Sequence, residues 1–317
     1  MPTIAVVGEV VADAVLPPDG IAEGVAHLTV HPGGGPANTA VALSRLGSTA
    51  RFAARISGGA LGALCRAKLE ESKVDLSASE NAVEPATLAI ARLDATGAAS
   101  YEFYTDGTAD WAWTDASLGR LIDGPFGSHS PPVALHTGSL ALAIQPSGQV
   151  IEDLLARARP SMTTSVDPNL RPLLVPVTSY RLWIDRWAAL ADILRLSEDD
   201  LDLLWPGWTP EQAATHLHAC GVPLAVVSLG GDGAFASLRG EQVRVPIAPT
   251  TLVDTVGAGD SFHGGLLHFL AEAGQLGGRL ETLTIDSLTE AIAFASRVSA
   301  INCSRAGANP PWASELN

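Results

Sequence analysis

The sequence contains little cysteine and little positive charge. Its three cysteines, Cys65, Cys220 and Cys303, are widely spaced and form no CxxC pair. Neither a disulfide framework nor a zinc cluster is predicted from them, and we expect the thiols to be small core residues in helices. The 19 lysines and arginines are outnumbered by 34 acidic residues, which gives a net charge of −15. Because nucleic acids and acidic membranes bind basic faces, neither is an expected partner.

Long hydrophobic runs and several well-known site patterns are also missing. The uncharged stretch at 124–151 is interrupted by proline, glycine and serine, so it does not predict a membrane span. The N-terminus opens with the strand-like TIAVVG and no basic segment, so we expect a cytoplasmic protein. The absence of GxxxxGK(S/T), HRD and DFG excludes P-loop kinases and protein kinases by motif. His216 and His218 are predicted to face different sides of a helix, so they do not predict a metal site.

The sequence does contain a regular alternation of strands and helices. Hydrophobic residues make up 47% of the 317 residues, which is enough for a large core. Ile4–Gly8 and Ala50–Ile56 are expected to be strands, and strands alternate with helices through most of the chain. The pattern predicts an α/β fold with a doubly wound, mostly parallel sheet covered by helices on both faces, in a single domain at 1–317. Strands at about 10–31 and 87–106 interrupt this alternation and are expected to form a small β lid.

The most informative stretch is DTVGAGDSF, at Asp254–Phe262, which follows an apolar run expected to be a strand. Glycines at a strand-to-helix turn let the backbone approach a ligand, and the first N–H groups of a helix attract phosphate. We expect the N–H groups of Gly257, Ala258 and Gly259 to bind such an anion. Asp260 would then accept a proton from a hydroxyl that attacks phosphorus. With a reference pKa of roughly 3.9 it is a weak base, and the alternative is a simple helix cap.

Two further motifs indicate a family. They are GGGPANTAVALSRLG at Gly33–Gly47 and DPNLRP at Asp167–Pro172. Together with DTVGAGDSF they resemble the signatures of the ribokinase/PfkB-like carbohydrate kinases, and look most like fructokinase-type members and 2-keto-3-deoxygluconate kinases. The resemblance covers nearly the whole chain. It implies a ribokinase-like fold and an ATP-dependent sugar kinase that transfers the γ-phosphate to a sugar hydroxyl, with ATP and Mg²⁺ as cofactors and K⁺ as a further candidate.

The resemblance also implies residues that bind the sugar. Asp13, at the family's GExxxD spacing, would accept hydrogen bonds from sugar hydroxyls, and Gly34 and Asn38 would contact the sugar from the glycine loop. Asn169 and Arg171 follow a buried strand, where ligands of such sheets bind, and Arg171 could pair with a phosphate or a substrate carboxylate. The structural alternatives are a solvated Asp13, an Asn38 that bonds its own backbone, and an Asx-type turn in DPNLRP.

A nucleotide site is implied further along the chain. SLGGDG follows a valine-rich strand and resembles the nucleotide turn of the family, with Ser228, Gly230 and Gly233 at the matching positions. A plain hairpin turn is the alternative for this stretch. Asn302 lies where family members pack the adenine ring.

Two acidic residues are candidates for contact with cations. Ser197 and Asp200 stand where the family has an Asn-x-x-Glu stretch that organises Mg²⁺ through water. Helix capping by the same two residues is an equal alternative. Asp254 would lie beside a monovalent cation, K⁺, which only the resemblance suggests.

One departure from the family leaves the sugar open. Where family members usually show an acidic pair, this chain has SGGALG at Ser57–Gly62. A fructokinase-like activity is expected, and ribose, 2-keto-3-deoxygluconate and nucleosides are alternative substrates. A catalytically inactive sugar-binding protein is the alternative of another class. The expected partner is a small-molecule sugar, and the expected assembly is a monomer or a homodimer.

Overall fold

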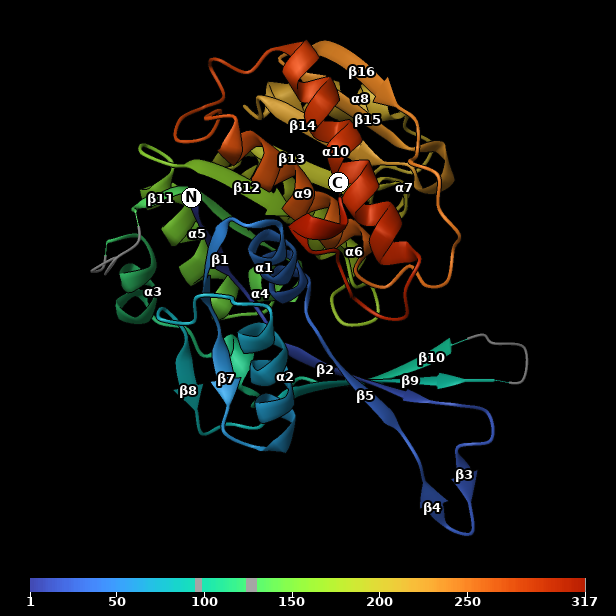
Figure 1. The fold of residues 1–317 in the computed structure, drawn as a ribbon. Coiled ribbons are helices and arrows are strands. Elements are labelled where there is room, and N and C mark those ends of the chain that lie inside the picture. The colour runs from blue at the N-terminus through green and yellow to red at the C-terminus, as the bar shows by residue number, and fades with distance from the viewer. Residues whose placement is uncertain (95–98, 124–129, 317) are drawn as a thin grey trace.

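A central eight-stranded sheet organises the molecule (Figure 1). The structure is a computed structural model, and it describes residues 1–94, 99–123 and 130–316. The strand order is β16-β15-β14-β13-β12-β11-β1-β6, parallel except for the antiparallel β15 and β16. The strands are β1 (Thr3–Val7), β6 (Thr49–Ala53), β11 (Pro132–Gly138), β12 (Thr163–Asp167), β13 (Ile193–Ser197), β14 (Leu224–Ser228), β15 (Ala234–Leu238) and β16 (Glu241–Val245). The predicted mostly parallel sheet is confirmed.

Helices cover both faces of this sheet and create two apolar cores. On one face lie α3 (Asp115–Ile122), α4 (Ser139–Ala143), α5 (Ser147–Ala158), α6 (Val177–Leu190), α7 (Glu198–Leu204) and α8 (Pro210–Ala219). On the other lie α1 (Gly35–Leu46), α2 (Ala60–Glu71), α9 (Ala258–Glu272) and α10 (Ile285–Cys303). Short 3-10 turns lie at Ala109–Trp111, Gly230–Asp232 and Ala313–Glu315. Among the described residues, no helix is both long and apolar enough to cross a membrane.

A second, four-stranded sheet projects from the body and forms the predicted lid (Figure 1). Its order is β10-β9-β2-β5, and β2 and β9 run parallel although they are distant in sequence. The strands are β2 (Val11–Leu16), β5 (Thr29–Gly33), β9 (Thr87–Leu93) and β10 (Ala99–Tyr104), with the small hairpin β3 (Ile21–Ala22) and β4 (Val25–Ala26) at the tip. The turn that the sequence predicts at 94–97 lies mostly outside the described residues. The lid strands start at the carboxyl-end edge of the main sheet, which places them over the region of the sequence motifs.

The residues before α9 do not form the strand that their composition predicts. Leu252, Val253 and Val256 are exposed, with 65%, 61% and 50% of their surface accessible. The N–H groups of Val253 and Asp254 donate to the Cys303 carbonyl at the end of α10, at 2.8 and 3.2 Å. These bonds take the place of a strand ladder, so an irregular segment leads into α9.

The predicted strand at 50–56 is also two elements rather than one. Its first part is β6 of the main sheet, and its second part is β7 (Arg55–Ser57), which pairs with β8 (Glu80–Ala82) in a separate two-stranded sheet. The Phe52 N–H donates to the Asp75 carbonyl, and the Phe52 carbonyl accepts the Ser79 hydroxyl. No further strand of the main sheet pairs with these two groups in the described part of the chain. The segment at 50–56 therefore pairs first with β1 and then with β8. A continuous apolar pattern does not reveal such a change of pairing strand.

Candidate active site

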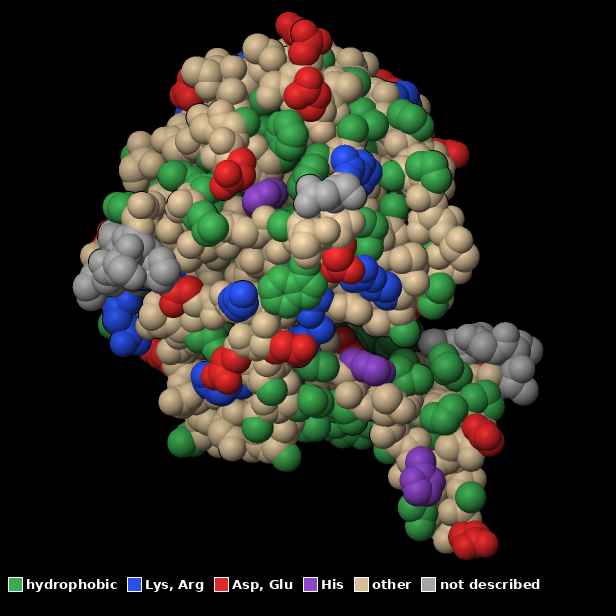
Figure 2. All heavy atoms as spheres, viewed as in Figure 1, with side chains coloured by type: hydrophobic (Ala, Val, Ile, Leu, Met, Phe, Trp, Pro, Cys, Tyr) green, Lys and Arg blue, Asp and Glu red, His purple; other side chains and the backbone are tan. Residues whose placement is uncertain are grey.

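Asp260 lies in the first turn of α9, in a recess where the body meets the lid. Helix α9 begins after Gly257, whose left-handed backbone (φ 72°) requires glycine. Figure 2 shows the surface hollowed beside the base of the lid. Asn38 Nδ2 on α1 donates to Asp260 Oδ2 at 2.8 Å. A Cβ on Gly35 would lie 3.4 Å from Asp260 Oδ1, so glycine leaves room beside this second oxygen. The two family motifs thus meet at one carboxylate.

Burial changes the basicity of this carboxylate. Asp260 is only 9% exposed. Desolvation raises the pKa of Asp260 to about 7, and Asp167 adds to the rise, while the Asn38 hydrogen bond, Arg171 and Arg195 oppose it. The sequence alone predicts a weak base at the reference value. The structure instead places a base whose pKa is near neutrality, which is favourable for proton transfer at physiological pH.

The start of α9 offers backbone N–H groups to an anion. The Ala258 N–H donates to the Thr255 carbonyl at 3.1 Å, so it must exchange partners before it can contact a phosphate. Gly257 and Gly259 flank it at the N-cap and the second helical position. A Cβ on Gly259 would lie 2.6 Å from Arg195 Nη1, so the guanidinium packs directly against this backbone. The anion site predicted at this turn would therefore combine a helix N-terminus with a buried cation.

Arg195 is the functional residue that sequence reasoning missed. It lies inside β13 and is 5% exposed. Its Nη1 donates to Asp167 Oδ2 at 2.9 Å, and its Nη2 donates to Ser228 Oγ. Asp167 Oδ1 and Arg195 Nε have no hydrogen-bond partner among the described residues. An arginine within an apolar strand was the available signal, because a buried charge requires a partner or a ligand.

A small polar cavity adjoins Asp260. Its volume is about 10 Å³, which is room for about one water molecule. Its walls include His136, Ser139, Asp167, Asn169 and Asp260. The Arg195 guanidinium and two buried histidines, His136 and His263, hold the pKa of Asp167 well below its usual range. The cavity therefore places a carboxylate with a lowered pKa beside one whose pKa is raised to about 7.

The predicted sugar residues line the approach to Asp260 from the lid. Asp13 on β2 pairs with His31 of β5, and its side chain lies over Gly33, where a Cβ would be 1.9 Å from Asp13 Oδ2. Burial raises the pKa of Asp13 to about 6, with Arg171 and His31 opposing the rise. Gly34 has φ 105°, and a Cβ there would lie 2.5 Å from the Glu9 carbonyl. Gly33 therefore leaves room for the Asp13 carboxylate, and Gly34 allows close backbone packing against Glu9.

Asn169 and Arg171 form a tight turn after β12. Arg171 Nη1 donates to Asn169 Oδ1 at 2.6 Å and to the Leu170 carbonyl at 2.9 Å. Asn169 has the left-handed φ of 41°, and its Nδ2 lies 3.2 Å from where a Gly35 Cβ would be. The structural alternative for this turn is thus present. The charge of the exposed guanidinium also opposes the rise that burial causes in the pKa values of Asp13 and Asp260.

Several known proteins are similar to this chain in sequence and in fold. A model of the pfkB family carbohydrate kinases matches residues 1–315. The chain belongs to this family. A fructokinase of Rhizobium leguminosarum bv. trifolii is 37% identical over 236 residues, which cover 74% of this chain and 70% of that protein. The protein is thus an ATP-dependent carbohydrate kinase.

Solved structures agree with this assignment. The fructokinase of Xylella fastidiosa with bound ATP superposes with a TM-score of 0.87 at 24% identity, over 99% of this chain and 96% of that one. The fructokinase of Vibrio cholerae O395, solved with fructose, ADP and calcium, superposes with a TM-score of 0.79 at 27% identity, over 97% and 94% of the two chains. A double mutant of the Vibrio enzyme holds fructose, ADP and a potassium ion.

The predicted nucleotide turn follows β14 directly. Gly230 and Gly233 have φ angles of 52° and 88°, and a Cβ on Gly233 would lie 2.1 Å from the Val245 carbonyl. Ser228 bonds the Arg195 guanidinium, so this turn is linked to the anion site at α9. The predicted nucleotide contacts of Ser228, Gly230 and Gly233 stay predictions, with a geometry that needs both glycines.

Asn302 is fully buried; its Nδ2 donates to the Val256 carbonyl at 2.8 Å, and its Oδ1 accepts the Asn309 N–H at 2.7 Å. These bonds connect the segment before α9 to the loop after α10, and the predicted nucleotide contact of Asn302 stays a prediction. Asp254 accepts the N–H groups of Val256 and Gly307 at 3.0 and 2.7 Å. Its predicted contact with a monovalent cation stays a prediction.

Asp200 forms the helix cap that the sequence left as an alternative. Its Oδ2 accepts the Ser197 N–H at 3.0 Å, and its Oδ1 accepts the Leu170 N–H at 2.8 Å. The side chain is 4% exposed, so both oxygens are occupied and covered. Asp200 does not fit a direct Mg²⁺ ligand, and a contact through water stays a prediction. Its observable effect is to position the turn that carries Arg171.

A further buried carboxyl group, not foreseen from the sequence, lies at the base of the lid. Asp110 accepts the Val10 N–H at 2.8 Å and the Thr87 hydroxyl at 2.6 Å. These two partners stand at the roots of β2 and β9, so Asp110 ties the two central lid strands together. Burial raises its pKa to about 6, and that of neighbouring Glu9 to about 7.

Proposed function

We propose that this carbohydrate kinase transfers the γ-phosphate of Mg·ATP to a hydroxyl of fructose. The observation that carries the proposal is the Asn38–Asp260 pair at the start of α9, which joins the two motifs at one carboxylate with a pKa of about 7. Fructokinases are the relatives with the sequence similarity reported above, and the Vibrio enzyme binds fructose. Sugar would lie between the lid and the Gly33–Asn38 loop, and ATP along the Ser228–Gly233 turn.

The proposed reaction uses the two oxygens of Asp260 differently. Asn38 holds Oδ2, while Oδ1 faces the open side and accepts the proton of the attacking sugar hydroxyl. The hydroxyl oxygen forms a bond to the γ-phosphorus, the bond to the bridging oxygen breaks, and ADP leaves with that electron pair. The N–H groups at the start of α9 and the charge of Arg195 offset the negative charge that develops. Asp13 would orient the sugar by accepting its other hydroxyls.

Ions, assembly and location complete the proposal. Mg²⁺ would arrive with ATP as part of the substrate, and a monovalent cation such as K⁺ would lie near Asp254, by analogy with the potassium-bound Vibrio mutant. The monomer or homodimer and the cytoplasmic location expected from the sequence stay predictions. Sedimentation analysis in the presence and absence of sugar distinguishes the two assemblies.

The decisive experiment measures ADP release from Mg·ATP with fructose, ribose, 2-keto-3-deoxygluconate and no sugar. We expect the highest kcat/KM with fructose. Asp260→Asn should lower kcat by roughly 10²- to 10⁴-fold, the usual contribution of a general base, with unchanged ATP affinity. Asp286→Asn is the matched control, because Asp286 is an exposed acid in the first turn of α10 and lies outside the site. Near-normal turnover in Asp260→Asn would refute the assignment of the base.

A second substrate is favoured by one observation. The exposed guanidinium of Arg171 faces the sugar site and could pair with the carboxylate of 2-keto-3-deoxygluconate. Arg171→Gln should then raise KM for that sugar acid and leave KM for fructose nearly unchanged. If none of these sugars supports ADP release while ATP still binds, the fructose proposal fails, and an untested substrate such as a nucleoside or the inactive sugar binder takes its place.

A further inference from the structure

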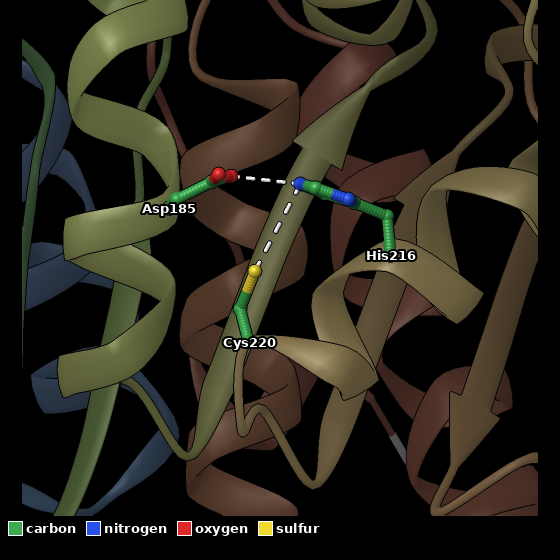
Figure 3. A group of neighbouring side chains, drawn as sticks. All are labelled: Asp185, His216 and Cys220. Atoms are coloured by element: carbon green, nitrogen blue, oxygen red, sulfur yellow. Dashed lines mark hydrogen bonds and ion pairs between the residues drawn. The ribbon is translucent and has the colours of Figure 1, made fainter.

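Three metal-ligating side chains converge on the face of the molecule formed by α6 and α8 (Figure 3). Asp185 comes from α6, and His216 and Cys220 come from the last turn of α8 and its C-cap. Asp185 Oδ1 lies 2.7 Å from His216 Nε2, and Cys220 Sγ lies 3.8 Å from the same nitrogen. One ligand atom from each residue lies within 4.8 Å of the others, the only such group among the described residues.

This cluster is remote from the kinase site. Helix α8 precedes β14, so its C-terminal turn lies at the end of the sheet where β14 begins. Asp260 and Arg195 belong to the opposite edge, where β14 ends at Ser228. The cluster therefore takes no part in binding ATP or sugar, and its chemistry requires a separate explanation.

The donor set is one that zinc prefers. Imidazole nitrogen, thiolate sulfur and carboxylate oxygen bind Zn²⁺ at about 2.0–2.3 Å, and tetrahedral geometry then places the ligand atoms roughly 3.3–3.6 Å apart. The observed separations of 2.7 and 3.8 Å lie on either side of this range. Small rotations of the Asp185 side chain, which is 60% exposed, would reach it. Three ligands leave a fourth position for water.

The surroundings hold the imidazole in place. Trp205 and Trp208 stack on each other at 5.2 Å, and both meet the His216 ring edge-on at 5.2 and 5.7 Å. The neighbouring His218 lies in a different environment, because its two ring nitrogens form hydrogen bonds with the Val222 carbonyl and the Ser237 hydroxyl. The predicted separation of His216 from His218 is therefore correct. The i, i+4 pair of His216 with Cys220 was missed, because this thiol was expected in the core and is only half-buried.

We propose that Asp185, His216 and Cys220 form a binding site for a thiophilic divalent cation, above all Zn²⁺, that links α6 to α8. The site would bind one ion per chain with one water molecule. Because the ion bridges two helices that pack on the same core, binding would stabilise the folded state without changing the phosphoryl transfer reaction.

The test uses the full-length enzyme freed of metal by a chelator that is then removed. Zn²⁺ titration by calorimetry should show one equivalent, and Co²⁺ should give the thiolate charge-transfer absorption of a tetrahedral site. Both signals should disappear in Cys220→Ser and His216→Ala. Cys303→Ser is the matched control, because Cys303 is a second half-buried thiol at a helix C-terminus and should leave both signals intact.

Stability gives an independent readout. Saturating Zn²⁺ should raise the Tm of the wild type and of Cys303→Ser, and should leave the Tm of Cys220→Ser unchanged. All variants should retain kinase activity, which confirms that they are folded. Zn²⁺ binding with equal stoichiometry and affinity in Cys220→Ser and the wild type would overturn the proposal. Absence of the Co²⁺ thiolate band in the wild type would overturn it as well.

Discussion

At the residue scale, the pKa of Asp260 determines how activity depends on pH. Burial raises this pKa from 3.8 to about 7, and only the ionised carboxylate can accept the sugar proton. We expect kcat/KM for the sugar to rise with pH, reaching a plateau above pH 7. Asn38→Ala should shift this acidic limb to higher pH, because the hydrogen bond from Asn38 favours the charged form. A pH–rate profile measures both effects, and a limb unmoved in Asn38→Ala would contradict the assigned contact.

Contiguous motifs reveal some residues of the site and conceal others. Asp260 and Asn38 were identified from the sequence because each lies in a long run of matching residues. Arg195 was missed because its role depends on Asp167 and Ser228, which come from two neighbouring strands and meet it only in the folded sheet. The elevated pKa of Asp260 was missed for the same reason, since desolvation is a property of the packed structure.

At the element scale, two helices must approach closely for Asn38 to reach Asp260. A Cβ on Gly264 of α9 would lie 2.7 Å from Ala42 Cβ on α1. We expect Gly264→Ala to push the helices apart, to destabilise the fold by roughly 1–3 kcal/mol and to lower kcat in the protein that still folds. Urea unfolding and steady-state kinetics provide the two measurements.

A matched glycine in α3 provides the control for this substitution. A Cβ on Gly119 would have no atom within 4 Å, so Gly119→Ala should stabilise the protein by roughly 0.5–1 kcal/mol. Equal effects of the two substitutions would show that close packing of α1 against α9 does not hold Asn38 within reach of Asp260.

Element order was predictable because hydrophobic periodicity reports burial along each segment. The alternation of strands and helices was predicted, and the strand expected at Ile4–Gly8 is β1, Thr3–Val7, within one residue at each end. The failures lie where tertiary bonds override composition. Residues 251–256 bond the end of α10 instead of forming a strand, and the run at 50–56 divides between two sheets.

At the scale of the whole molecule, the net charge of −15 acts differently on the two substrates. Mg·ATP is an anion and is repelled at long range, whereas fructose is neutral. Raising the salt concentration from about 0.01 to 0.15 M shortens the screening length from about 30 to 8 Å. We therefore expect kcat/KM for Mg·ATP to rise by roughly 2- to 10-fold and kcat/KM for fructose to stay constant.

The salt dependence of kcat/KM for the sugar also distinguishes the two candidate substrates. For an anionic sugar acid, the same screening should raise kcat/KM together with that for Mg·ATP. Tetramethylammonium chloride is the suitable salt, because K⁺ would also act at the cation position predicted beside Asp254. If kcat/KM for Mg·ATP falls as salt rises, the local charges of Arg171 and Arg195 outweigh the net charge, and long-range repulsion does not control encounter with the nucleotide.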